Sequence, residues 1–375
     1  MRGRRLLGLA GLAAGAGLWA LAAHRLWRTT VPGGLSLSGE DAHASFGAAF
    51  LARSASYERF LAIDALLAGL VVIATLALYA RHGQRLTRES AAGPIGTGML
   101  LGMLGLGIAW LAGLPFDLAA IWWERRHGVS HQGYVLALVQ GFLGLGGTFL
   151  AICVALLVAM FLARLLRGWW WLAAAPCFVA LALASAYLSP FFVPATHALH
   201  GRATLTDARA LARAEGVAGT RVEVQDAHRE TTAPNAEAVG FGATRRVVLW
   251  DTLLDGRFSR REVRVVLAHE LGHLANDHVL KGVGWLALFL VPASGLIALA
   301  TRRRGGLRTP EGVPIALFAL VALSLLATPL RNVVTRRVEA EADWAALQTT
   351  HDPVAARSAF RRLATASLAD PDPPA

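Results

Sequence analysis

Long apolar runs separated by short arginine-containing loops constrain the fold of this chain more than any other feature. A run of about 20 apolar residues is long enough to cross a bilayer as one helix, and lipid admits only segments that satisfy their own backbone hydrogen bonds. Hydrophobic residues make up 55% of the 375 residues and charged residues only 16%, which excludes an ordinary soluble protein. The sequence therefore predicts a mainly α-helical, multi-pass membrane protein.

Seven ranges are predicted to span the membrane: about 6–23, 61–80, 95–114, 148–165, 169–187, 283–300 and 313–330. A cleaved signal peptide is the alternative for the first range, because Ala20-Leu21-Ala22 resembles a cleavage site, but its length favours a retained helix. The stretch 134–166 is too long for one span, so its glycine-containing first part is predicted to be an interfacial or re-entrant helix. Residues after Pro115 are predicted to form a connection outside the lipid.

The net charge of +11 comes almost entirely from arginine, since Lys281 is the only lysine. Most of these arginines lie in short runs beside apolar stretches, which indicates membrane topology and not a nucleic-acid surface. We take the near absence of lysine as a sign of a GC-rich bacterial source. We therefore expect a bacterial cell-membrane protein whose partners include membrane lipids and no nucleic acid.

A polar region between residues 190 and 281 is predicted to form a soluble domain. Short strands are expected at 221–225, 234–239 and 246–250, and a helix near 206–215. The edge of such a sheet commonly pairs with an extended peptide, although simple sheet structure explains the same spacing. Three histidines of this region are expected to be surface or structural residues and not ligands: His197, His200 and His278. For His278, a role near the site is the alternative.

The soluble region contains His269-Glu270-Leu271-Gly272-His273, which is an H-E-x-x-H pattern. Residues four apart share one face of a helix, so both imidazoles can hold one metal ion while Glu270 reaches a water bound to it. Ser259 and Glu262 form a capping box, which predicts where this helix begins. The pattern predicts one zinc ion per chain with Glu270 as the catalytic base; two surface histidines on an ordinary helix are the alternative.

A catalytic zinc needs a third protein ligand, and its candidates lie beyond the last apolar run. Glu339 and Asp343 are four residues apart and share a helix face, whereas Glu341 points elsewhere. The prediction is that Glu339 is the third ligand and that Asp343 orients a ligand histidine. From spacing alone, a solvated helix with many charges is an equal alternative.

Two segments, HELGHLANDH and NVVTRRVEAEAD, together resemble the gluzincin membrane proteases typified by the type I CAAX prenyl endopeptidases, with HtpX-like proteases as nearest relatives. Further similar stretches, including NAEAVGFGATRRVVLWDTLL, extend the resemblance over about residues 114–343. It implies seven membrane helices around a large chamber that the zinc domain closes at one end. It also implies Glu339 as a ligand, Asp343 beside a ligand histidine, and Asn235 and Ala236 on a substrate-pairing edge strand.

The sequence departs from this family in two respects. Many members carry a His-Pro segment whose histidine stabilises the tetrahedral intermediate; no His-Pro follows Glu339 here, and Arg336 and Arg337 are the expected substitutes. Arginines in the short loops place the zinc domain outside the cytoplasm by the positive-inside rule. The family resemblance implies a cytoplasmic zinc domain instead.

The predicted fold is a polytopic membrane protein of about seven transmembrane helices with a zincin-like catalytic domain carrying a small β-sheet. Its expected function is zinc-dependent hydrolysis of peptide bonds in membrane-associated, prenylated or misfolded polypeptides. The alternative is a weak or inactive membrane scaffold or lipid-binding chamber with a structural zinc, which has no need of Glu270. The predicted parts are 1–189 (helices one to five), 190–281 (zinc domain), 282–330 (helices six and seven), 331–368 (third-ligand helix) and 369–375 (disordered tail).

Overall fold

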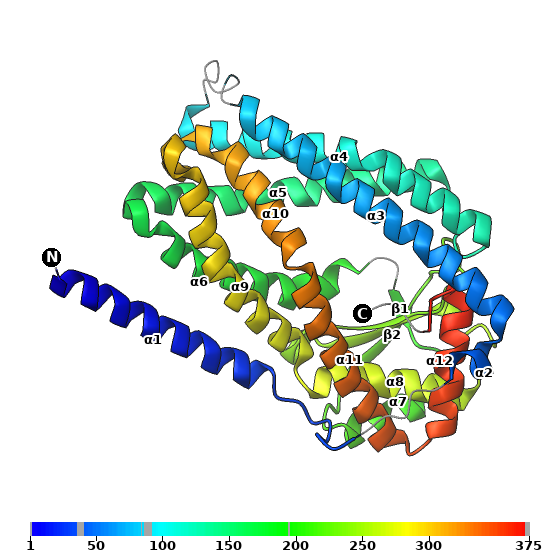
Figure 1. Cartoon of the computed structure of the whole chain (residues 1–375). Coiled ribbons are helices and arrows are strands. Elements are labelled where there is room, and N and C mark those ends of the chain that lie inside the picture. The colour runs from blue at the N-terminus through cyan, green and yellow to red at the C-terminus, as the bar shows by residue number, and fades with distance from the viewer. Residues whose placement is uncertain (1, 36–40, 84, 86–91, 194–195, 372–375) are drawn as a thin grey trace.

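Long helices form the larger part of the molecule, and a four-stranded sheet with its covering helices lies at one end of them (Figure 1). The computed structural model describes residues 2–35, 41–83, 85, 92–193 and 196–371, with side chains from Ala13 onward. The bounds of the long helices are α1 (Arg2–Leu26), α3 (Ala48–His82), α4 (Gly93–His127), α5 (Tyr134–Leu166), α6 (Trp170–Leu188), α9 (His278–Thr301) and α10 (Val313–Leu326). A short helix, α2 (Ala42–Phe46), precedes α3.

The predicted mainly α-helical membrane fold is confirmed, and each predicted span lies on one of these helices or, for 313–330, on α10 and the helix after it. Within the described residues, four helical segments are long and apolar enough to cross a membrane, and a bent pair, Pro310–Leu326 with Thr328–Thr350, raises the number to at most five. One of the four, Tyr134–Phe192, contains two of the seven predicted spans.

Contacts at both ends of the bundle show how the long helices are oriented. At the end near the sheet, Ser130, just after α4, forms a β-bridge with Thr231, which lies in the segment between the second and third strands of the sheet. At the far end, Arg304 donates a hydrogen bond to the carbonyl oxygen of Ala80, near the end of α3. Helices α3 and α9 therefore both run from the end near the sheet toward an arginine-rich far end, and α4 runs back.

The prediction of a separate interfacial or re-entrant helix in the first part of 134–166 is wrong, because α5 is one continuous helix of 33 residues. In an apolar environment, water does not compete for the backbone hydrogen bonds, so glycines that weaken a helix in water do not interrupt it. The residues after Pro115, which we predicted to lie outside the lipid, form the C-terminal part of α4, a helix of 35 residues. Such a helix is about 50 Å long and extends well beyond a hydrocarbon core of about 30 Å.

The predicted seventh span, 313–330, is interrupted at Ala327. Helix α10 ends at Leu326, and α11 (Thr328–Thr350) begins with Pro329 in its first turn, at an angle of 47° to α10. Proline cannot donate the hydrogen bond that would continue α10 without a break. Helix α12 (Pro353–Ser367) follows. Of the tail predicted as disordered, Asp370 donates its backbone N–H to Glu58, and residues 372–375 lie outside the described residues.

The sheet has the strand order β1 (Thr196–Ala198), β2 (Arg221–Gln225), β4 (Arg246–Trp250) and β3 (Ala236–Val239). Strands β2 and β4 are parallel, and the two outer strands are antiparallel to their neighbours. The three predicted strands are confirmed, whereas β1 was not predicted. Strand β3 lies at the edge of the sheet, directly after Asn235.

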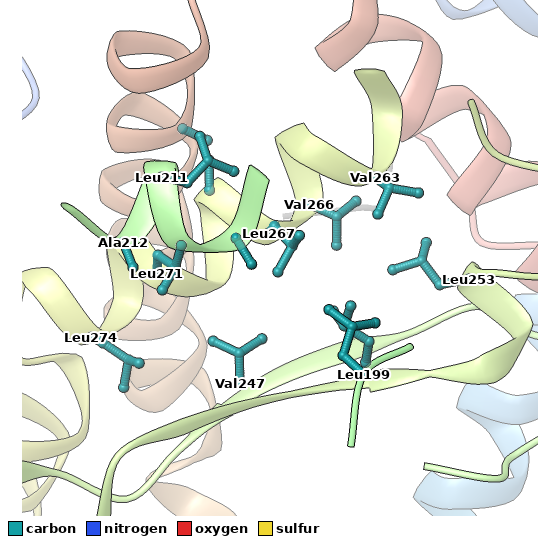
Figure 2. Close-up of a cluster of buried hydrophobic side chains, with 14 of the residues drawn as sticks. Leu199, Leu211, Ala212, Val247, Leu253, Val263, Val266, Leu267, Leu271 and Leu274 are labelled. Carbon is teal, nitrogen blue, oxygen red and sulfur yellow. The ribbon is translucent and has the colours of Figure 1, made fainter. Parts of the chain in front are cut away.

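Two helices, α7 (Arg202–Ala214) and α8 (Arg260–Ala275), cover one face of this sheet (Figure 2). Leu267 and Leu271 of α8 and Val247 of β4 are completely buried in the layer between them. Because these leucines recur at helical spacing, one face of α8 is fixed against the sheet. The opposite face, which carries His269 and His273, is thereby held in a defined direction.

The start of α8 follows the prediction. Ser259 is the N-cap, and the capping box with Glu262 is complete. The carboxylate of Glu262, a residue only 2% exposed, also accepts hydrogen bonds from Ser358 and Arg362 of α12. Burial would raise the pKa of Glu262, but the hydrogen bonds from Ser358 and Ser259 and the charge of Arg362 lower it. Glu262 therefore fixes both the start of α8 and the position of α12.

We expect Glu262→Ala to lower the free energy of unfolding by about 2–3 kcal/mol, because it removes a helix cap and leaves buried donors without an acceptor. The pKa of Glu262 is lower in the folded than in the unfolded state. Its contribution is therefore present above the ordinary value of about 4.5 and is lost as the pH falls. Thermal unfolding in detergent at pH 7 and at pH 3.5 measures both effects.

The matched control is Arg261→Ala, which removes an ion pair to Asp352 at the protein surface. Its effect on thermal unfolding should be much smaller, because water replaces the lost partner. Equal effects of the two substitutions would contradict the role assigned to Glu262.

Candidate metal centre

The close approach of α8 and α11 positions every residue of the candidate site. The two helices meet at Gly272, where a Cβ atom would lie 2.9 Å from the Cβ of Ala345 and 3.3 Å from the carbonyl oxygen of Ala342. Only glycine permits this separation. As a result, Glu339 and Asp343, one turn apart on α11, lie opposite His269 and His273 on α8.

The three predicted ligands lie together in one triangle. The Nε2 atoms of His269 and His273 are 3.0 Å apart. Oε2 of Glu339 lies 3.3 Å from Nε2 of His269 and 3.5 Å from Nε2 of His273. In a tetrahedral zinc site with bonds of about 2.0–2.2 Å, neighbouring donor atoms are about 3.3–3.6 Å apart. The two distances to Glu339 lie in this range, and the 3.0 Å between the histidine nitrogens is shorter, so a small outward turn of the two rings would fit a zinc ion with one position left for another ligand.

The other ring nitrogen of His269 is held by Asp343, whose Oδ1 lies 2.8 Å from Nδ1. This contact leaves Nε2 directed at the triangle. Burial by itself would lower the pKa of His269, but the hydrogen bonds to Asp343 and Glu339 raise it to about 10. The carboxylates around this imidazole thus attract a positive charge, which a bound metal ion would supply in place of a proton.

Glu270 is buried, with 7% of its surface exposed, and lines the same cavity as the three candidate ligands. Burial raises the pKa of its carboxyl group, and the nearby charge of Glu339 acts in the same direction. A carboxylate of raised pKa binds a proton more readily than an ordinary glutamate. Glu270 is therefore suited to accept a proton beside the triangle.

Sequence reasoning gave a role near the site only as the alternative for His278, and it did not predict the contacts of this residue. It lies buried, with its Nδ1 2.8 Å from Nδ1 of His273 and its Nε2 3.0 Å from Oε2 of Glu341. A turn of two residues, Asn276 and the left-handed Asp277, separates α8 from α9 and brings His278 back beside His273. These turn residues are the signal that could have revealed the contact. His197 and His200 lie exposed near β1, away from the triangle.

A cavity of about 1120 Å³ opens at the triangle and extends between α9, α10 and α11. Its polar end contains the three candidate ligands, Glu270 and Asn235. The remaining wall is mostly apolar and includes Trp285, Phe289, Leu290, Leu320, Leu323 and Leu330. The candidate metal centre therefore lies at the polar end of a largely apolar cavity.

Strand β3 forms part of the polar end. Asn235 and Ala236 both line the cavity, and the carbonyl oxygen of Asn235 accepts a hydrogen bond from the backbone of Trp250. β3 pairs with β4 on one side only in the sheet that the structure describes. Glu237 of this strand also lines the cavity, and burial raises the pKa of its carboxyl group. Sequence reasoning did not single out this second carboxyl group.

The structure does not bring the two predicted arginines to the triangle. Arg337 donates from Nε to the carbonyl oxygen of Trp27 at 2.7 Å, and its guanidinium lies 4.5 Å from the centre of the Trp27 ring. Neither Arg336 nor Arg337 lines the cavity; the arginine of α11 that does is Arg331. The prediction that Arg337 contributes directly to catalysis is therefore not supported by its position.

Comparison with known proteins agrees with this geometry. Residues 206–375 match the model of Peptidase family M48. This range includes α8 and α11, and thus all three candidate ligands and Glu270. The resemblance to membrane metalloproteases that the motifs predicted is confirmed by this match.

Individual proteins that are similar in sequence to this chain are also named as proteases. The chain is 31% identical over 157 residues to the uncharacterised metalloprotease YhfN of Bacillus subtilis, covering 39% of this chain and 36% of YhfN. It is 32% identical over 135 residues to an HtpX protease homologue of Burkholderia multivorans, covering 35% of this chain and 46% of the relative. The chain thus spans less than half the length of either relative.

The crystal structure of S. mikatae Ste24p superposes with a TM-score of 0.67 over 96% of this chain and 91% of Ste24p, at 18% sequence identity. The two proteins therefore share a fold. The superposition extends far beyond residues 206–375, so the helices outside the region of sequence similarity have the same arrangement.

We expect Asp343→Asn to weaken zinc binding by about 10–100-fold, because the carboxylate that orients His269 is lost while all three candidate ligands remain. Competition with a chromophoric chelator measures the affinity of the purified protein. Asp255→Asn, at an exposed position away from the site, is the control and should bind zinc as the parent does. An unchanged affinity of Asp343→Asn would show that Asp343 does not orient a ligand.

Proposed function

We propose that this protein is a membrane-embedded, zinc-dependent endopeptidase with one zinc ion per chain. The observation that carries the proposal is the triangle of His269, His273 and Glu339 beside the buried Glu270. The distances from Glu339 to the two histidines match those of a tetrahedral zinc site, and the histidine nitrogens, 3.0 Å apart, are slightly closer than such a site requires. The match of residues 206–375 to a peptidase family supports the same reaction class.

His269, His273 and Glu339 would hold the zinc ion and leave one position open toward the cavity. Zinc bound there supplies a Lewis acid that polarises the scissile carbonyl group and lowers the pKa of water. Asp343 keeps the His269 ring in the orientation that directs Nε2 inward. These residues lie on two packed helices, so the site is assembled before substrate binds.

Glu270 carries out the proton transfers. Its carboxylate takes the proton from the attacking water and then passes it to the nitrogen of the leaving amine. Burial supports this role because it raises the pKa of Glu270 and so increases its affinity for the proton. The one residue thus acts first as general base and then as general acid.

The substrate peptide binds in extended form along Asn235 and Ala236. The unpaired side of an edge strand offers backbone N–H and C=O groups, which hold a peptide with little regard to its sequence. Both residues line the cavity that contains the triangle. Pairing along this edge would bring a peptide bond of the substrate past Glu270.

The apolar walls of the cavity determine the substrate class. A cavity of about 1120 Å³ lined by leucines, Trp285 and Phe289 stabilises large apolar groups that leave water. Prenyl chains and the apolar side chains of unfolded membrane polypeptides share this chemistry. We therefore propose membrane-associated polypeptides with exposed apolar or prenyl groups as substrates.

Cleavage assays with purified full-length protein in detergent test the activity. The substrates are a prenylated peptide, the same peptide without the prenyl group, and an unfolded polypeptide. We expect the parent to cleave, and Glu270→Ala to retain zinc while its cleavage rate falls by about 10²–10⁴-fold. Glu311→Ala, at the far end of the bundle, is the control. If the zinc-loaded parent cleaves none of the three substrates, the result would favour the alternative function, an inactive membrane scaffold or lipid-binding chamber with a structural zinc.

We also propose that the zinc domain lies outside the cytoplasm. Several arginines lie at the end of the helix bundle farthest from the sheet: Arg81, Arg164, Arg302, Arg303, Arg304 and Arg308. Two contacts support this arrangement, from Arg304 to the carbonyl oxygen of Ala80 and from Arg164 to that of Arg308. Arginine in short loops favours the cytoplasmic side, and the zinc domain lies at the opposite end of the helices (Figure 1).

Cysteine labelling in intact cells tests this orientation. In a background of Cys153→Ala and Cys177→Ala, single cysteines replace the exposed Arg229 of the zinc domain or the exposed Arg303 of the far end. A membrane-impermeant maleimide should label the first variant in intact cells and the second only after lysis. The reverse pattern would place the zinc domain in the cytoplasm.

A further inference from the structure

A chain of hydrogen bonds leads away from the candidate metal centre at His273, whereas Asp343 contacts the other histidine, His269. Nδ1 of His273 lies 2.8 Å from Nδ1 of His278, and Nε2 of His278 lies 3.0 Å from Oε2 of Glu341. The side chains of His278 and Glu341 are each 4% exposed. His273 thus uses one ring nitrogen for the triangle and the other for this chain.

Only one set of tautomers satisfies every contact in this chain. A ligand imidazole offers an unprotonated nitrogen to the metal, so the proton of His273 is on Nδ1 and is donated to Nδ1 of His278. The proton of His278 is then on Nε2 and is donated to the carboxylate of Glu341. Each ring orients the next, and Glu341 fixes the end of the series.

The carboxylate of Glu341 is itself held by two further donors. Its Oε2 accepts from Nζ of Lys281 at 2.7 Å, and its Oε1 accepts from the backbone N–H of Thr30 at 2.8 Å. A buried carboxylate needs such donors to offset its loss of hydration. Thr30 belongs to the segment that follows α1, far from the soluble domain in sequence. The first helix of the chain is therefore connected to the candidate metal centre.

Further contacts hold this segment in place. Arg337 of α11 binds the carbonyl oxygen of Trp27 and lies over its ring. The ring of Trp27 packs edge-on against Trp285 of α9, with 6.1 Å between ring centres. Leu26 lies close to Gly284, where a Cβ atom would come within 2.8 Å of it. These contacts join the end of α1 to α9 and α11, the two helices that carry His278 and Glu341.

We propose that the segment after α1 is part of the metal centre and that Glu341 and His278 are positioning residues for His273. The N–H of Thr30 fixes Glu341, Glu341 fixes His278, and His278 sets the orientation in which Nε2 of His273 faces the metal. The inference rests on the proposed zinc site. It extends that site to a segment outside residues 206–375, the range that matches the peptidase family.

Substitution of Thr30 separates the backbone N–H from the side chain. Thr30→Pro removes the N–H that Glu341 accepts, whereas the matched control Thr30→Ala keeps it. We expect zinc affinity, measured by chelator competition on the full-length protein, to fall about tenfold in Thr30→Pro and to stay unchanged in Thr30→Ala. The zinc affinities of the Glu341→Gln and His278→Ala variants should each be about 10–100-fold lower than that of the parent.

Because proline at position 30 could cause misfolding, a second variant tests the same segment without an introduced proline. Arg337→Ala releases Trp27 without altering the chain near Thr30, and it should weaken zinc binding in the same direction. Thermal unfolding of the zinc-free proteins separates orientation from stability. If Thr30→Pro and Arg337→Ala unfold at lower temperature but bind zinc as tightly as the parent, the segment serves only packing and the inference is overturned.

The outcome also distinguishes this inference from the proposed function. Normal zinc affinity in all variants, together with a parent that cleaves peptides, would overturn the inference and leave the peptidase proposal intact. A parent that binds no zinc would overturn the proposed function itself. Weaker binding in Thr30→Pro and Arg337→Ala, with Thr30→Ala unaffected, would support the inference.

Discussion

The candidate site depends on the close contact between α8 and α11. Gly272 permits the two backbones to approach until a Cβ atom at that position would clash with Ala345. This separation places Glu339 within 3.5 Å of both candidate ligand histidines. The sheet and α7 fix the position of α8 through its buried leucines, and α12 fixes it through Glu262. All three therefore help to hold α8 in its position against α11. The geometry of the triangle is therefore a property of helix packing.

The molecule resolves a conflict between two environments. The zinc ion, carboxylates and water of the proposed reaction require polar surroundings, whereas the proposed substrates, with their large apolar groups, require an apolar wall. The cavity satisfies both, because its polar end is built from α8, α11 and β3 and its apolar wall from α9, α10 and α11. The buried charges that remain satisfy one another, as the contacts of Glu341 with Lys281 and His278 illustrate. Isolated, each of these groups would be costly to bury.

Local patterns were sufficient to predict many of the elements. Ser259 and Glu262 fixed the start of α8, and β-branched residues located β2 and β4. Where the environment overrides a local preference, prediction failed. The glycines of α5 indicated a break that an apolar surrounding removes, and the bend at Ala327 follows from Pro329 within a continuous apolar run. The position of His278 depends on a turn of two residues whose direction the sequence does not state.

The sequence by itself determined the chemical groups that can act: the spacing of His269, Glu270 and His273, and the shared face of Glu339 and Asp343. Periodicity is a local property, so it places residues on one face of one helix. Only the tertiary structure decided that these two faces meet, that Arg337 contacts Trp27 instead of the triangle, and that Thr30 reaches Glu341. Such contacts join segments far apart in the chain, and they arise from the packing of whole helices, which no local pattern encodes.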